Sequence, residues 1–172
     1  MKNYIKEGQK LPLFGIGPYL MAGVFLVTAI FIIVFNYVMK SGVVSGIWIT
    51  VFRLSGAVLI IIGLLVWYKG AVSSDIDNLI ADNKLKTDGV FACVRNPMYS
   101  GIWLVITGFS MMWHNYLVLL SIPVNWIIIT VVLKNTEEKW LLETYGQQYL
   151  DYKRRVNRLI PWFTKPENKK IQ

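Results

Sequence analysis

The sequence predicts an all-α integral membrane protein with about four transmembrane helices, the last two forming a short hairpin, plus a cytoplasmic C-terminal helix. Hydrophobic residues make up 55% of the 172 residues. Three long stretches carry no charge, apart from one arginine in the second, and each is long enough to cross a hydrocarbon core about 30 Å thick. Lysine and arginine are concentrated between and after these stretches. We expect residues 1–172 to form a single membrane domain.

The first predicted transmembrane helix covers residues 18–39. No charged residue lies between Leu11 and Met39, and Pro18 stands near the start of this run. Proline is favoured in the first turn of a helix, where its missing N–H is not needed. The apolar stretch is longer than that of a signal peptide and no small-residue cleavage pattern closes it, so we expect it to be retained.

The second predicted transmembrane helix covers residues 47–68. Arg53 is its only charge and lies about one turn from the outer end if the membrane-crossing part begins near Ile49. A long cationic side chain at that depth can snorkel to the membrane surface, so we interpret Arg53 as an interfacial residue. The polar segment 69–96 follows as a cytoplasmic loop, with a short amphipathic surface helix expected over residues 72–81.

Asn96 and Pro97 predict the start of the third transmembrane helix, residues 97–113. The Asn side-chain oxygen can accept from free N–H groups of the first turn, and Pro is favoured next. Such a helix start carries partial positive charge and suits a carboxylate or phosphate. Arg95 adds a full cation beside it. Taken alone, these residues fit a capped membrane helix with an interfacial arginine equally well.

The fourth predicted transmembrane helix, residues 116–134, follows a turn that contains His114. This is the only histidine in the chain. We interpret it as a turn residue, which excludes a Ser-His-Asp hydrolase. Pro123 is expected to kink the helix.

The cytoplasmic C-terminal helix is predicted over residues 135–159. It begins with a capping arrangement at Thr136 and continues with a stripe formed by Tyr145, Tyr149 and Tyr152. Gly146 lies within the stripe and is expected to bend or interrupt the helix.

The distribution of cations predicts the membrane topology. Of the 18 lysines and arginines, nine lie from Lys134 onward, four between Lys69 and Arg95, and three before the first span. The positive-inside rule then places both termini and the middle loop in the cytoplasm of a cell-membrane protein. We therefore read the net charge of +8 as an orientation signal and expect no nucleic-acid partner. The single cysteine, Cys93, excludes an internal disulfide and a Cys-rich metal site, and we expect no metal.

Several motifs together resemble the isoprenylcysteine carboxyl methyltransferase family, integral membrane enzymes related to the phospholipid N-methyltransferases. The motifs are Arg-x-Pro-x-Tyr-x-Gly from Arg95 to Gly101, the acid pair Glu137-Glu138, and Tyr-Gly-x-x-Tyr-x-x-Tyr from Tyr145 to Tyr152. The resemblance covers residues 84–163, about half the chain. Asn96 replaces a histidine that is common in the family, and an amide cannot titrate.

The resemblance implies an S-adenosylmethionine-dependent methyltransferase whose lipophilic acceptor, a carboxylate, amine or phenol, enters from the bilayer among the membrane lipids. It implies Arg95 and Glu138 as catalytic residues and Lys134 as a residue that attracts an anionic acceptor. The implied cofactor contacts are Leu85, Lys86, Phe91, Asn96, Pro97, Met98, Tyr99 and Glu137.

Two other functions remain open at this stage. Sterol-type membrane reductases have a similar C-terminal pattern and use NADPH. The cationic residues 153–155 can bind the extra phosphate of that cofactor. A non-catalytic lipid-binding or scaffold protein is the second alternative, in which the acid pair only caps a helix.

Overall fold

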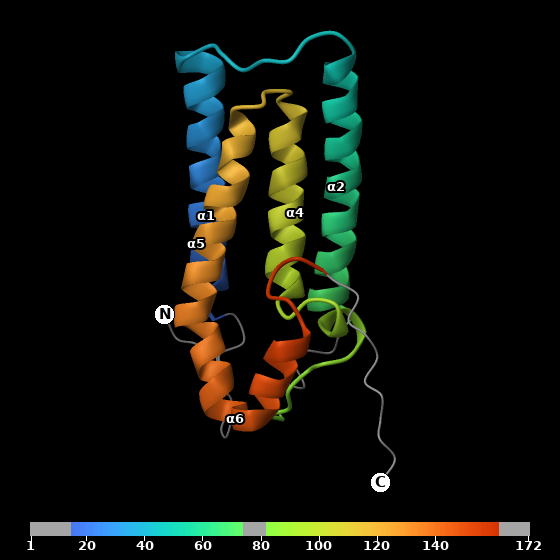
Figure 1. Ribbon diagram of the computed structural model, residues 1–172, viewed down its shortest axis with the longest axis vertical. Helices are drawn as coiled ribbons and strands as arrows, with labels where there is room; N and C mark the ends of the chain where they lie inside the picture. Colours follow the sequence, from blue (N-terminus) through green and yellow to red (C-terminus); the bar gives the residue numbers. More distant parts are fainter. Residues whose placement is uncertain (1–14, 74–81, 162–172) are drawn as a thin grey trace.

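The computed structural model describes residues 15–73 and 82–161, and its regular elements within these ranges are helices (Figure 1). A single isolated bridge joins Val43 to Asn115. The elements are α1 (Gly17–Ile33), the π-helix η1 (Val34–Val38), α2 (Ile47–Ala71), the 3-10 helix η2 (Gly89–Ala92), α4 (Pro97–Met112), the 3-10 helix η3 (Val118–Leu120), α5 (Ser121–Asn135) and α6 (Glu137–Arg155). The protein is therefore all-α over the described residues. The surface helix expected over residues 72–81 falls largely on residues 74–81, which lie outside them.

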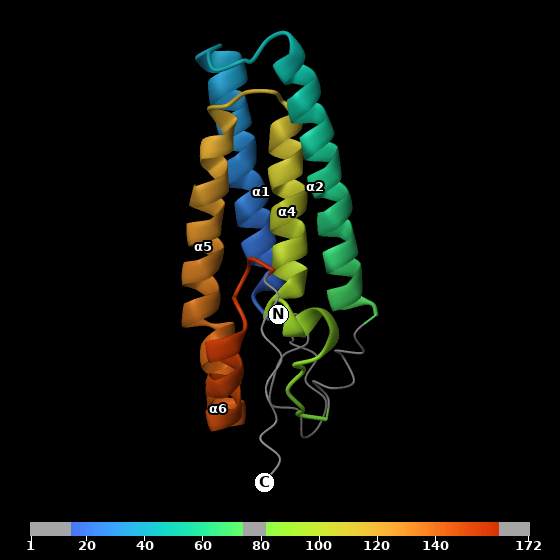
Figure 2. The same ribbon diagram turned by 45° about the vertical axis from the view of Figure 1, so that its right-hand side comes forward.

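Three of the described helices are long and apolar enough to cross a membrane, which makes the chain an integral membrane protein. They span Gly17–Val38, Ile47–Ala71 and Val118–Asn135. Figures 1 and 2 show these helices and α4 side by side, with α4 next to α2 and α5 next to α1. α6 lies beyond one end of the four-helix bundle, where α1 begins and α4 begins.

The helix that follows the α4–α5 turn starts differently from the prediction. It opens with the 3-10 turn η3 at Val118 and becomes α-helical at Ser121. Pro123 is consequently the third residue of α5, where a proline removes no intrahelical hydrogen bond. The kink expected at Pro123 stays a prediction.

Asn115 ties the two connections at the end of the bundle opposite α6. Its side chain is fully buried, and Nδ2 donates to Asn36 Oδ1 at 3.1 Å and to the Ser41 carbonyl at 2.9 Å. His114 precedes it with φ of 40°, in the left-handed region, and is the turn residue that the sequence predicts. This polar contact holds the α1–α2 connection against the α4–α5 turn.

Glycines bring the backbones of α2 and α4 into direct contact. Gly56, Gly63 and Gly70 are the buried residues of α2, and the large apolar side chains of that helix point outward. A Cβ atom added to Gly63 would lie 2.6 Å from the carbonyl oxygen of Gly101 on α4. Small residues of this kind let membrane helices approach closely without a hydrophobic driving force from water.

We expect Gly63→Ala to destabilise the protein by about 1–3 kcal/mol, because the new methyl group meets backbone that has no room to move. Thermal unfolding of purified protein in detergent measures the effect. Gly23→Ala is the matched control, since a Cβ atom there on α1 meets open space. Equal unfolding midpoints for the two variants would contradict the close α2–α4 contact.

Candidate functional site

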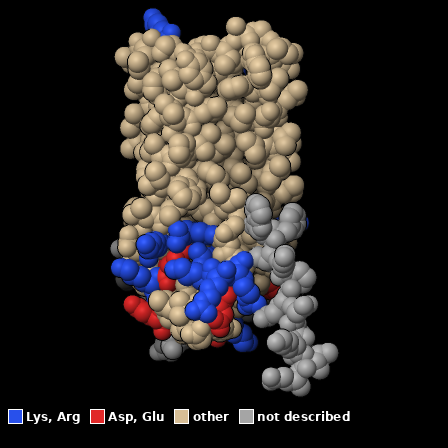
Figure 3. Space-filling model, in the orientation of Figure 1, with Lys and Arg blue, Asp and Glu red and all other residues tan. Residues whose placement is uncertain are grey.

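The charged residues of the described chain gather at the α6 end of the bundle. Figure 3 shows Lys, Arg, Asp and Glu clustered around this end, a long tan body above it, and a small blue patch of Lys or Arg at the opposite end. Beneath the surface, Tyr149, Tyr152 and Val156 form an apolar cluster against which Leu85 packs. The charged end therefore has a core of its own, on which polar groups can be held in place.

The segment before α4 is held against the segment after α6 by backbone hydrogen bonds. The N–H of Arg95 donates to the Asn157 carbonyl at 2.8 Å, and the N–H of Asn96 donates to the Arg158 carbonyl at 3.2 Å. These bonds join residues 62 positions apart. They fix the start of α4 beside the C-terminal end of α6.

Both predicted side-chain caps are wrong. Asn96 precedes α4, but its Nδ2 donates to the Arg158 carbonyl at 3.2 Å and its side chain forms no cap hydrogen bond. Thr136 precedes α6, but its hydroxyl donates to the Val132 carbonyl at 2.7 Å. In each case a nearby carbonyl engages the side chain in place of the free N–H groups of the helix.

Glu138 is the centre of a buried ion cluster. Its side chain is 2% exposed and contacts three cations. Oε1 lies 3.0 Å from Arg95 Nη2 and 2.5 Å from Arg158 Nε, and Oε2 lies 3.0 Å from Lys153 Nζ. The family resemblance implied Arg95 and Glu138 as catalytic residues, and the structure pairs the two and adds two further cations.

The pKa of Glu138 shows that this carboxylate stays ionised. Burial raises the pKa, but the hydrogen bond from Arg158, the charge of Arg95 and the hydrogen bond from Lys153 outweigh it and bring the pKa to about 2. A group with so low a pKa does not accept a proton near neutral pH. Glu138 is therefore suited to hold Arg95 in position.

Glu137 has a different environment from its neighbour. The Tyr99 hydroxyl donates a hydrogen bond to Glu137 Oε1, and the backbone N–H of Ile16 also bonds to the carboxylate. Burial raises the pKa of Glu137, and these two bonds oppose the shift in part. The contact with Ile16, just before α1, has no signal in the sequence, because nothing local links that segment to an acid 121 positions later.

Aromatic residues on α6 connect the ion cluster to the middle loop. Tyr152 is buried, and its hydroxyl donates to the Phe91 carbonyl at 2.6 Å. The guanidinium carbon of Arg95 lies 6.0 Å from the ring centroid of Tyr149, within the range of a cation–π contact. Phe91 itself is buried against this layer.

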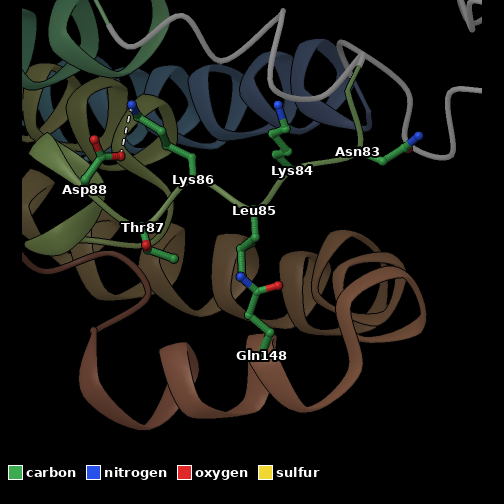
Figure 4. A pocket seen from close by; sticks show the side chains of 7 residues that line it. All are labelled: Asn83, Lys84, Leu85, Lys86, Thr87, Asp88 and Gln148. Carbon is green, nitrogen blue, oxygen red and sulfur yellow. Dashed lines mark ion pairs between the residues drawn. The ribbon is translucent and has the colours of Figure 1, made fainter.

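An open hollow of about 470 Å³ lies between the loop 83–88 and α6 (Figure 4). It contains Leu85 and Lys86 among the predicted cofactor contacts, and Gln148 of α6, which sequence reasoning missed. Figure 4 shows the Gln148 amide reaching toward Leu85, while Lys86 Nζ pairs with Asp88 at 2.9 Å. That hydrogen bond lowers the pKa of Asp88.

The predicted site residues therefore fall into two groups. Leu85 and Lys86 line the hollow, whereas Arg95 and the start of α4 lie with the acid pair. The second group comprises Arg95, Asn96, Pro97, Met98, Tyr99, Glu137 and Glu138. Phe91 is buried, and its carbonyl accepts a hydrogen bond from the Tyr152 hydroxyl. Lys134 is exposed on the last turn of α5 and has no part in the ion cluster. Across residues 15–73 and 82–161, no group of three His, Cys, Asp or Glu side chains is arranged to hold a metal ion.

Comparisons with known proteins identify relatives of this chain. Residues 51–148 match the family described as phospholipid methyltransferase. A methanethiol S-methyltransferase of Crocosphaera subtropica is 35% identical over 82 residues, which are 48% of this chain and 31% of the relative. A protein-S-isoprenylcysteine O-methyltransferase of Schizosaccharomyces pombe is 35% identical over 81 residues, 46% of this chain and 34% of the relative.

A third relative, protein-S-isoprenylcysteine O-methyltransferase B of Arabidopsis thaliana, is 31% identical over 87 residues, 46% of this chain and 41% of the relative. The matched part thus spans between 31% and 41% of the length of these three curated relatives. No solved structure matches the chain at a significant level.

Proposed function

This chain belongs to the phospholipid methyltransferase family, as its motifs predicted, and from that premise we propose that it transfers the methyl group of S-adenosylmethionine to a lipophilic acceptor. The observation that carries the proposal is the direct contact between the start of α4 and the start of α6. Arg95 pairs with Glu138 at 3.0 Å, and the Tyr99 hydroxyl bonds to Glu137. The two motifs behind the family resemblance therefore form one site.

We place this site at the cytoplasmic face of the cell membrane. α4 has 16 residues, a length of about 24 Å, and carries no charge, so it can cross as a fourth helix in a hairpin with α5. The charged end in Figure 3 then meets the cytoplasm with α6 and both termini, in agreement with the positive-inside rule.

The residues at the site fit a methyl donor that carries one negatively charged and one positively charged group. Arg95 has a buried Nε atom without a hydrogen-bond partner among the described residues, and Glu137 offers a carboxylate. When bound, S-adenosylmethionine supplies an electrophilic methyl group on sulfur. Glu138 holds Arg95, and Tyr99 holds Glu137, so the site is organised before a ligand arrives. Methyl transfer to a good nucleophile depends on such alignment, so no titrating group is needed at Asn96.

We assign the cofactor contacts in two groups. The methionine end is bound by Asn96–Tyr99 at the start of α4 and by Glu137 of the acid pair. Leu85 and Lys86 in the hollow bind the nucleoside, on the layer that Phe91 supports. The acid pair lies before the kink of α6 at Gly146, where φ is 52°, and Gln148 of the hollow lies just after it.

The acceptor is proposed to reach the site from the bilayer. The names of the relatives specify a thiol in two cases and an isoprenylated cysteine in two others. An acceptor with a carboxylate, thiol, amine or phenol on an apolar body fits this route. Lys134 is exposed three residues before Glu137 and can attract an anionic acceptor.

We expect the purified protein to bind S-adenosylmethionine and S-adenosylhomocysteine, and not NADPH. Titration calorimetry in detergent with each ligand measures this. Tight NADPH binding without S-adenosylmethionine binding would favour the sterol-type reductase instead. Incubation of membranes with methyl-labelled cofactor then identifies the acceptor: base-labile label indicates a carboxyl ester, and stable label an ether, thioether or amine.

A further inference from the structure

Two polar atoms are buried at the charged end without any hydrogen-bond partner among the described residues. They are the hydroxyl of Tyr149 and Nε of Arg95. Tyr149 is 1% exposed and Arg95 is 9% exposed. An unsatisfied buried polar atom costs free energy, so native proteins place nearly all such atoms against a partner. Two of them in neighbouring groups indicate a place that a ligand fills.

Both atoms are hydrogen-bond donors. The Arg95 guanidinium is always protonated, and Nε carries one N–H. Burial, and after it the charge of Glu138, raises the pKa of the Tyr149 hydroxyl, although Arg95 and Arg158 oppose the shift. The hydroxyl therefore keeps its proton at neutral pH. The ring of Tyr149 lies beside the guanidinium, with 6.0 Å between ring centroid and guanidinium carbon.

The surrounding charge favours an anionic partner for these donors. Arg95, Lys153 and Arg158 all pair with the one carboxylate of Glu138. Two positive charges in the cluster are therefore uncompensated. The side chains of Arg158 and Lys153 are 20% and 39% exposed and reach water, whereas that of Arg95 is 6% exposed, so an anion held by Tyr149 and Arg95 would compensate the one cation that water reaches poorly.

A group suited to a cation lies next to this anion-binding pair. Glu137 precedes Glu138 in the sequence, and its charge acts on the Tyr149 hydroxyl together with that of Glu138. The Glu137 carboxylate accepts hydrogen bonds from the Tyr99 hydroxyl and from the Ile16 backbone N–H. Arg95 pairs with Glu138, and the adjacent Glu137 bonds to Tyr99, so donors for an anion and a carboxylate for a cation both occur where α4 and α6 begin, as the carboxylate and ammonium of an α-amino acid require.

We propose that the Tyr149 hydroxyl and Arg95 Nε bind the carboxylate of the amino-acid end of the methyl donor, while Glu137 binds its ammonium group. This inference rests on the proposed methyltransferase function and assigns Tyr149 to the site. It also moves the carboxylate away from the helix start at Asn96, where the sequence alone put it. The Asn96 backbone N–H and side-chain amide are both bonded to the Arg158 carbonyl.

Tyr149→Phe tests the proposal, because it removes the hydroxyl and keeps the ring beside Arg95. The full chain in detergent is titrated with S-adenosylhomocysteine, which has the amino-acid end, and with 5′-methylthioadenosine, which lacks it. We expect Tyr149→Phe to weaken the affinity for S-adenosylhomocysteine about tenfold, the value of one hydrogen bond to a charged group. The affinity for 5′-methylthioadenosine should stay unchanged.

Two control variants separate binding from folding. Tyr152→Phe removes a hydroxyl that donates to the Phe91 carbonyl, so it should lower the thermal unfolding midpoint, whereas Tyr149→Phe should not. Tyr145→Phe changes a half-buried tyrosine of α6 by removing its hydroxyl, and it should change the affinity for neither ligand. Unchanged S-adenosylhomocysteine affinity in Tyr149→Phe, or an equal loss for both ligands, would overturn the proposal. Wild-type protein that binds neither ligand would instead contradict the proposed function itself.

Discussion

Replacement of Glu138 by glutamine is expected to cost about 3–5 kcal/mol of folding free energy, because it removes the one counter-charge of three clustered cations. Arg95 and Glu138 are both buried, so water does not take over the lost interactions. Arg95 then loses the contact that holds it beside the start of α4. Thermal and denaturant-induced unfolding of the purified protein in detergent measures the loss.

Asp151→Asn is the matched control for Glu138→Gln. Asp151 pairs with Arg154 at 3.6 Å, but both side chains are more than half exposed. A surface ion pair of this kind contributes about 0–1 kcal/mol, so the control should unfold close to wild type. Equal losses of stability in both variants would contradict the conclusion that the ion cluster around Glu138 stabilises the fold.

The same carboxylate predicts how stability changes in acid. Glu138 has a pKa of about 2 in the folded protein, below its ordinary value of 4.5. Its contribution is therefore complete above about pH 4.5 and is lost as the pH falls from there toward 2. Unfolding measured across this range should show a decline for wild type that Glu138→Gln largely lacks.

Glu137→Gln is expected to weaken S-adenosylhomocysteine binding by a factor of about ten or more, because it removes the negative charge proposed to bind the ligand's ammonium group. Gln keeps the size of the side chain and can still accept from Tyr99. Stability should therefore change less than in Glu138→Gln. Calorimetric titration of both variants and wild type provides the comparison.

The pH dependence of binding is a second measurement on Glu137. Burial raises the pKa of this carboxyl group, so it takes up a proton at a higher pH than an ordinary glutamate. Affinity for S-adenosylhomocysteine should fall as the pH is lowered through that pKa, and Glu137→Gln should lack this fall. In a non-catalytic scaffold, where the acid pair only caps α6, Glu137→Gln would leave binding unchanged.

The sequence contained a signal for the close contact of α2 and α4, but not for every residue of the candidate site. Gly56, Gly63 and Gly70 are spaced seven apart, as are Gly101 and Gly108. This spacing places them on one face of each helix, and it was available without a structure. Gln148 had no such signal, because an amide on an amphipathic helix is ordinary. Tyr149 belongs to the Tyr-Gly-x-x-Tyr-x-x-Tyr motif, but nothing in the sequence distinguishes its hydroxyl from those of Tyr145 and Tyr152.

The helix caps show why local rules failed at the site. Asn96 and Thr136 have the residue types and positions that favour a cap. The carbonyl that engages Asn96 belongs to Arg158, 62 positions away, and becomes available only when α6 folds back on the start of α4. Competition from a group so distant cannot be read from neighbouring residues, whereas Thr136 bonds to the Val132 carbonyl only four positions away.

The sequence by itself determined that the chain is a helical membrane protein of a methyltransferase family, because the lengths of apolar runs, the positions of charges and short motifs are properties of neighbouring residues. Only the tertiary structure decided that Glu138 gathers three cations, that Glu137 bonds to Tyr99, and that Tyr149 lies unpaired beside Arg95. These contacts join residues many positions apart. Each depends on how the helices pack and on which polar atoms that packing leaves buried.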